Sequence, residues 1–163
     1  MTRGRLLAAA IALVAGVLTY LLVARDSATP EELILRKAVA MADAAERKDL
    51  GFIMKQVSER FRTEDGSSRD DVKGLLAGQL FRGEWVRVMT ANVDVTMTSA
   101  ATADFHGTYI FGRSEAKTLK DLAKESVIAA YEITARVERE SDGEWRFVSA
   151  SWATADAASL LAP

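Results

Sequence analysis

Cysteine is absent from this 163-residue chain, histidine occurs once and proline twice. Without cysteine the chain has no disulfide, thiolate nucleophile, cysteine-ligated zinc or lipidated cysteine. A single histidine, His106, excludes a metal site built from several histidines of one chain. Positive charge is not in excess either, because 21 Lys and Arg stand against 23 Asp and Glu, a net charge of −2. A nucleic-acid partner usually requires a basic stripe, so none is expected.

Motifs for cofactors and for nucleophilic catalysis are also missing. The sequence holds no glycine-rich phosphate loop, GxSxG elbow or EF-hand loop, and we expect neither a metal nor a cofactor. What the chain does have is 49% hydrophobic and 27% charged residues, a balance typical of a folded protein. Its length suits one domain. We divide it into an N-terminal segment, 1–28, a domain, 29–153, and a C-terminal tail, 154–163.

The N-terminal segment contains a long apolar run. Residues 6–24 are 19 positions without a charge or a proline. As a helix this run would extend about 28 Å, close to the thickness of the hydrocarbon core of a bilayer. Arg3 and Arg5 precede it, so the positive-inside rule places the N-terminus in the cytoplasm and exports the domain. Because no good cleavage site follows, we predict an uncleaved signal anchor with one transmembrane helix; a cleaved signal is the alternative.

Apolar spacings of three and four predict three helices in the first half of the domain. The first begins at Thr29-Pro30-Glu31-Glu32, with Thr as the cap and Pro at the first position, and ends near Lys48. A second, short helix carries Phe52, Ile53 and Val57. Residues 58–61 then lead into a polar loop at 63–67. The third helix starts at the cap Ser68-Arg69-Asp70-Asp71, and its apolar stripe is Val72, Leu75, Leu76 and Leu80.

From Trp85 onward the apolar period changes to two, which predicts half-buried antiparallel strands. The alternating stretches are 93–97, 105–111 and 131–137. Between the last two lies a mostly polar segment, 115–125, which we expect to be a loop or a short surface helix.

Ser141-Asp142-Gly143 predicts a hairpin turn. A three-residue loop with Gly143 in the left-handed region would place Val137 opposite Phe147 and Arg139 opposite Trp145, which brings apolar side chains together. The order of elements predicts an α+β domain, in which three N-terminal helices pack on one face of a mainly antiparallel sheet of four or more strands.

Three stretches of the domain carry a family resemblance. They are Val57-Ser58-Glu59-Arg60-Phe61, Gly66-Ser67-Ser68-Arg69-Asp70-Asp71-Val72-Lys73, and Asp142-Gly143-Glu144-Trp145-Arg146-Phe147 through Trp152. In combination they make residues 30–152 resemble the nuclear transport factor 2-like superfamily (cystatin-type cone, SnoaL-like), above all its exported bacterial members of largely unknown function. The resemblance implies a strongly curved sheet that wraps the helices around a cavity. With the predicted anchor, it implies a periplasmic domain on a single-pass protein of the bacterial inner membrane, or a secreted periplasmic protein if the signal is cleaved.

Enzymes of this superfamily, such as ketosteroid isomerases and dehydratases, hold an acid/base carboxylate or histidine inside the cone together with tyrosine donors. An apolar cavity tunes the pKa of such groups toward the working pH. Here the polar residues on the apolar strand face are Tyr109, Tyr131 and small hydroxyls such as Ser149. The opposite face carries Asp94, Asp104, His106, Glu132 and Glu138. We therefore predict no catalytic residues, although His106 and Asp94 could be either a base with its orienting acid or a cross-strand pair on the polar face.

The predicted ligand-binding residues are aromatic: Tyr109, Tyr131, Trp85 and Phe111. The tyrosines either donate hydrogen bonds in the cavity or belong to the core, and Trp85 either floors a ligand site or packs at a hairpin end. We predict a membrane-tethered, extracytoplasmic, non-catalytic module that binds a partner protein or a small apolar ligand, with a homodimer through the sheet as a further contact. The alternative is a small isomerase, dehydratase or cyclase-like enzyme that uses acids on the helices in the same cavity.

Overall fold

The computed structural model describes residues 28–118, 120–122 and 127–155. The chain separates into the units Met1–Pro30 and Glu31–Pro163, and the second holds the described helices and strands apart from Pro30, the first residue of its first helix. Within the described ranges, none of the helices combines the length and the apolar character needed to cross a membrane. The transmembrane helix predicted at 6–24 lies outside these ranges.

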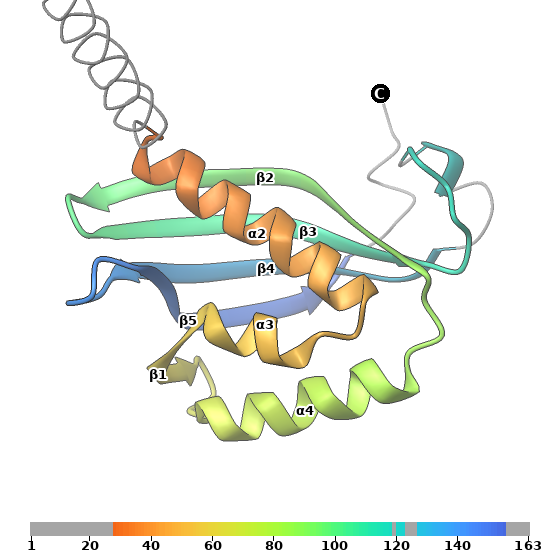
Figure 1. Ribbon diagram of the computed structural model, residues 1–163, viewed down its shortest axis with the longest axis horizontal. Coiled ribbons are helices and arrows are strands. Elements are labelled where there is room, and N and C mark those ends of the chain that lie inside the picture. The colour runs from red at the N-terminus through yellow and green to blue at the C-terminus, as the bar shows by residue number, and fades with distance from the viewer. Residues whose placement is uncertain (1–27, 119, 123–126, 156–163) are drawn as a thin grey trace, which may run out of the picture. The chain divides into compact units, whose positions relative to one another are not determined.

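The domain is α+β, as the pattern of elements predicted. Its helices are α2 (Pro30–Glu46), α3 (Leu50–Lys55) and α4 (Arg69–Arg82). Its strands are β1 (Val57–Thr63), β2 (Arg87–Ser99), β3 (Thr102–Gly112), β4 (Val127–Arg139) and β5 (Trp145–Thr154). They form one sheet in the order β1-β5-β4-β3-β2, in which only the β1–β5 pair is parallel. Figure 1 shows α2 crossing one face of this sheet, with α3 and α4 toward its β1 edge.

The strand β1 corrects the prediction for 57–67. We expected Val57 in a short helix with Phe52 and Ile53, and 58–61 as a lead into a polar loop. Instead 57–63 form a strand in which Val57 and Phe61 are both buried, with a register shift between Val57 and Arg62. Val57 is paired with Phe147 of β5, and the Phe147 N–H donates to the carbonyl of Gln56 at 2.9 Å. A spacing of four between buried residues fits a strand as well as a helix, because both structures bring residues i and i+4 to the same face.

The helices begin where their caps predict. In α4 the Ser68 hydroxyl accepts from the Asp71 N–H while the Asp71 carboxylate accepts from the Ser68 N–H, a complete capping box. The predicted stripe of α4 is wrong at Leu75, whose exposed fraction is 48%, because the helix packs through Val72 and Leu80. In α2 the buried positions include Ile34 and Ala38, as predicted, but the helix ends at Glu46.

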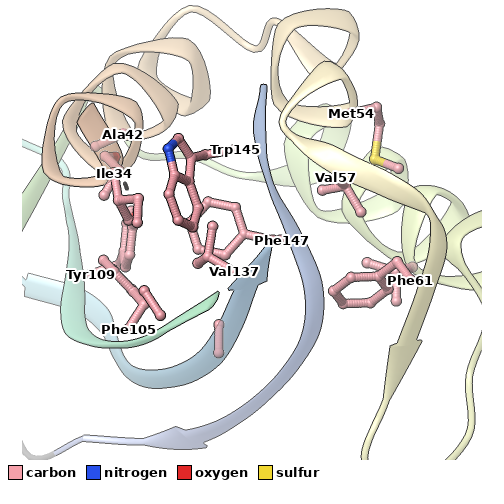
Figure 2. Packing of buried hydrophobic residues seen from close by; sticks show 14 of the residues in the cluster. Ile34, Ala42, Met54, Val57, Phe61, Phe105, Tyr109, Val137, Trp145 and Phe147 are labelled. Carbon is pink, nitrogen blue, oxygen red and sulfur yellow. Dashed lines mark hydrogen bonds between the residues drawn. The ribbon is translucent and has the colours of Figure 1, made fainter. Parts of the chain in front are cut away.

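The core lies between α2 and the sheet. Figure 2 shows Phe105, Tyr109, Val137 and Phe147 gathered beside Ile34 of α2. The rings of Phe105 and Phe147 meet edge to face, with their centroids 5.5 Å apart. The hairpin register is confirmed: Val137 faces Phe147, Arg139 faces Trp145, and Gly143 has a φ of 86°.

A bulge changes the phase of β5 after Phe147. Val137 pairs with Phe147 but Arg136 pairs with Ser149, so Val148 has no partner on β4. As a result Ser149 faces away from the helices, opposite to our prediction for its hydroxyl. The even-numbered residues that follow, among them Trp152, share the face of the core instead.

Within 115–125, which we expected to be a loop or a short surface helix, Leu122 packs into the fold. Leu122 is fully buried and packs with Ile110 and Ala130 on the sheet face opposite the helices. It lies against Gly112, where an added Cβ would come within 2.2 Å of the Leu122 side chain. The close approach of Leu122 therefore requires glycine at position 112.

Candidate functional site

Three of the four predicted ligand-binding residues lie in one line on the sheet face that carries the core. The rings of Trp85 and Phe111 meet edge to face with centroids 5.0 Å apart, and those of Phe111 and Tyr131 do the same at 6.0 Å. Phe111 comes from β3 and Tyr131 from β4, where Tyr131 is paired with Tyr109 and so lies diagonally from Phe111. We call Trp85, Phe111 and Tyr131 the aromatic row; each of the three is half-buried.

The ring of Trp85 is held on several sides. Its Nε1 donates to the carbonyl of Ala45 at 3.1 Å, which fixes the indole against the end of α2. The ammonium of Lys48 lies 3.3 Å from the ring centroid, a cation–π contact. Gly83 leaves room for the ring, because a Cβ there would lie 1.6 Å from an atom of the indole. The position of Trp85 is therefore set by α2 and by the turn before β2.

Tyr109 belongs to the core instead. Its side chain is buried and its hydroxyl donates to the carbonyl of Ala38 in α2 at 3.1 Å. Burial raises the pKa of Tyr109 above its usual range. The hydroxyl of Tyr131, by contrast, makes no hydrogen bond with a described residue. Of the two tyrosines, only Tyr131 has a free donor to offer to a ligand.

Two apolar residues beside the row were missed in the sequence. Ile133 follows Tyr131 on the same face of β4 and is paired with Trp152 of β5. The exposed fraction of Trp152 is 46%, although it shares the face on which the core is built. Because of the bulge at Val148, counting alternate residues from Phe147 along β5 would place Trp152 on the opposite face. The available signal was the aromatic character of Trp152 near the end of a strand.

The predicted polar pair lies on the other face of the sheet. His106 and Asp94 are paired in register, as expected for neighbouring strands. The His106 Nε2 lies 3.2 Å from a carboxylate oxygen of Glu132, and the imidazole is 42% exposed. Within the described ranges, the buried polar side chains besides Tyr109 are those of Gln56, Ser58, Thr63 and Thr108. The described part of the chain therefore holds no buried carboxylate or imidazole, and no group of three or more potential metal ligands.

Comparison with known proteins gives a fold rather than a family. No family model matches the sequence, and no curated protein matches it. A protein of unknown function with a cystatin-like fold from Nostoc punctiforme superposes with a TM-score of 0.57 at 11% identity, covering 76% of this chain and 89% of that one. A protein assigned as a dehydratase of the nuclear transport factor 2-like family from Streptomyces avermitilis gives 0.55 at 16%, covering 76% and 95%. The fold is nuclear transport factor 2-like.

A second neighbour with an enzyme's name is equally distant in sequence. The hexachlorocyclohexane dehydrochlorinase of Novosphingobium barchaimii superposes on this nuclear transport factor 2-like domain with a TM-score of 0.55 at 12% identity. The match covers 76% of this chain and 85% of the dehydrochlorinase. At such identities the likeness carries the fold alone, because this fold can hold different sites.

A charged cavity of about 370 Å³ lies elsewhere in the domain, with Met54 and Val57 in its lining. Its Arg146 makes a two-pronged ion pair with Asp142, at 3.0 and 2.7 Å, and contacts Glu140 at 2.5 Å. The hydrogen bond from Arg146 lowers the pKa of Asp142 to about 2. Because carboxylates already occupy Arg146, we interpret this cavity as part of a structural network rather than as a ligand site.

Proposed function

We propose that the domain is a non-catalytic binding module that takes a small apolar ligand on the open part of its helix-facing sheet surface. The observation that carries the proposal is the aromatic row together with Ile133 and Trp152. These side chains share the face of the core but remain half-buried or exposed. Apolar side chains left uncovered next to a packed core are typical of a ligand or partner surface.

The size of the patch agrees with a small ligand of moderate affinity. A flat ligand that covers roughly 200 Å² of apolar protein surface buries about as much of its own, and the roughly 400 Å² removed from water contributes about 10 kcal/mol at 25 cal/mol per Å². Lost freedom of the ligand offsets part of this gain, so we expect a dissociation constant on the order of 0.1 mM for a simple apolar probe. The free hydroxyl of Tyr131 adds a hydrogen-bond donor beside the rings.

The absence of acid/base groups among the described buried residues supports binding over catalysis. Proton transfer needs a carboxylate or imidazole within hydrogen-bond reach of the substrate and with a suitable pKa. His106 lies on the opposite sheet face beside Glu132, and the hydroxyl of Tyr109 is already bound to Ala38. The isomerase or dehydratase alternative would need acids that reach the aromatic row from the helices.

The test uses N-phenyl-1-naphthylamine, a neutral probe whose emission rises in apolar surroundings. We expect saturable binding to the wild-type protein. Tyr131→Ala and Trp152→Ala should each raise the dissociation constant about five- to tenfold. Phe81→Ala is the matched control, because it removes an aromatic ring that is 84% exposed on α4, outside the patch. Equal losses in all three variants, or no binding by the wild type, would refute the proposal.

The membrane tether is a separate part of the proposal. It is supported by the uncharged run at 6–24 and by Arg3 and Arg5 before it. The full-length protein, expressed in a bacterium, should remain in the membrane fraction after a carbonate wash. Mass spectrometry should find the original N-terminus. A new N-terminus between residues 24 and 29 would show that the segment is a cleaved signal.

A further inference from the structure

The cationic side chains around the aromatic row differ in whether a carboxylate pairs with them. Arg87 follows two residues after Trp85, and its guanidinium pairs with the carboxylate of Glu46 at 3.3 Å. Arg113 follows two residues after Phe111 and pairs with Glu84. Each of these two arginines thus has a carboxylate partner.

Lys48 differs from both arginines. Its Nζ donates to the carbonyl oxygens of Gly83 at 3.2 Å and of Trp85 at 3.4 Å, and it lies over the Trp85 ring. Among the described residues, none of the carboxylates forms an ion pair with it. Burial lowers the pKa of Lys48. Its charge is therefore stabilised by neutral dipoles and a ring face and is left uncompensated at one end of the aromatic row.

The backbone at Lys48 shows that its side chain matters. The Asp49 N–H donates to the Ala44 carbonyl at 2.8 Å and the Lys48 N–H to the Ala45 carbonyl at 3.2 Å, the pattern of a Schellman motif that ends α2. Lys48 takes the left-handed position of this motif, with a φ of 59°. Glycine is the usual residue there, because a Cβ makes the conformation unfavourable. A lysine at this position offsets the strain through its side-chain contacts.

We propose that Lys48 gives the aromatic row a preference for ligands that carry an anionic group on an apolar body, such as aromatic carboxylates. The inference rests on the proposed function, since it concerns what the same patch selects. The Lys48 ammonium and the Phe111 ring lie 3.3 Å and 5.0 Å from the centroid of the same Trp85 ring. A ligand stacked beside Phe111 is therefore within about one Debye length of the ammonium, and the half-buried setting of Lys48 weakens the screening. The free hydroxyl of Tyr131 can donate to the same anionic group.

Three ligands that share a naphthalene ring but differ in charge separate the effect of charge on affinity from the effect of apolar burial. They are 2-naphthoate, 2-naphthalenemethanol and 2-naphthylmethylammonium, titrated by calorimetry at pH 7 into the full-length protein. We expect 2-naphthoate to bind about tenfold more tightly than the alcohol, and the ammonium ligand to bind more weakly than both. Lys48→Gln should remove the advantage of 2-naphthoate while the affinity for the alcohol stays within about twofold.

Two further variants complete the design. Lys48→Arg keeps the charge and should keep the preference. Lys73→Gln removes the same charge from an exposed position on α4 and should leave the preference unchanged. Equal affinities for the three ligands in the wild type would overturn the inference but leave the proposed function standing. A Lys48→Gln variant with reduced affinity for both the alcohol and 2-naphthoate would also overturn the inference, because Lys48 would then only position Trp85. Failure of all three ligands to bind would count against the proposed function itself.

Discussion

Replacing Tyr109 by phenylalanine tests whether this tyrosine is a core residue. The change removes one hydroxyl from a buried ring and breaks its hydrogen bond to the Ala38 carbonyl, 3.1 Å long. A buried hydrogen bond of this kind contributes about 1 kcal/mol to the free energy of unfolding. Because phenylalanine fills almost the same volume, we expect no additional cavity cost. At pH 7 the variant should therefore be less stable by about 1 kcal/mol.

The alkaline limb of the stability curve gives a sharper test. Burial raises the pKa of Tyr109 in the folded protein, whereas in the unfolded chain it ionises near its usual value of about 10. Above that pH the unfolded state loses a proton that the folded state keeps. The wild type then loses about 1.4 kcal/mol of stability per pH unit more than Tyr109→Phe. The advantage of about 1 kcal/mol at pH 7 should thus vanish at about pH 10.5 to 11.

Urea unfolding followed by tryptophan fluorescence, repeated from pH 7 to 11.5, measures both quantities. Subtracting the variant's curve from that of the wild type removes the contributions of other titrating groups, such as Lys48. Parallel curves above pH 9 would refute the burial of an un-ionised Tyr109 hydroxyl. A Tyr109→Phe variant as stable as the wild type at pH 7 would refute the hydrogen bond to α2.

Four further substitutions test other features. Gly83→Ala should displace the Trp85 ring, which an added Cβ would approach to 1.6 Å, and so lower the melting temperature and change the near-ultraviolet circular dichroism. Val137→Asp should cost several kcal/mol because Val137 is fully buried, whereas Thr134→Asp on the exposed face should cost less than about 0.5 kcal/mol; equal melting temperatures would contradict the strand phase. His106→Ala should leave stability within about 0.5 kcal/mol and any complementation phenotype intact, and loss of the phenotype alone would favour catalysis.

The features that were predicted correctly are those that depend on residues close together in the sequence. The capping box at Ser68 and the hairpin at Gly143 depend on a few neighbouring residues, and both formed as expected. The register of Val137 with Phe147 followed because only one loop length brings the apolar side chains together. Local patterns of this kind need no knowledge of distant contacts.

The features that failed depend on partners far along the chain. The strand β1 pairs with β5, which lies 80 or more residues later, whereas the local pattern of Phe52, Ile53 and Val57 suggested a helix. The bulge at Val148 likewise cannot be seen from simple alternation; it turns Ser149 away from the predicted core face and places Trp152 on that face. The packing of Leu122 against Ile110 also depends on the folded sheet and cannot be predicted from local sequence.

For a related reason, only part of the candidate site could be predicted from the sequence. Strand alternation places Phe111 and Tyr131 on the apolar face without any tertiary information. The contact of Lys48 with Trp85 joins the end of a helix to the start of a strand, 37 residues apart. Such a contact depends on how α2 ends, and a lysine in the left-handed position of a helix terminus is a weak signal in a sequence.

The end of α2 lies beside the aromatic row, whereas the preceding turns of the helix pack on the core. From Ile34 to Ala42 the buried side of the helix packs in the core on the sheet, and the hydroxyl of Tyr109 donates to the helix backbone at Ala38. At Ala45 the helix backbone accepts its last contact from the sheet side, the indole of Trp85, and the Schellman motif at Lys48 then turns the chain away. Farther along the same face Trp152 stays 46% exposed and is not among the residues that pack on the core beneath α2. The residue that stops the helix is therefore also the residue that brings a positive charge to the open surface, and this coincidence makes Lys48 the most informative position to mutate.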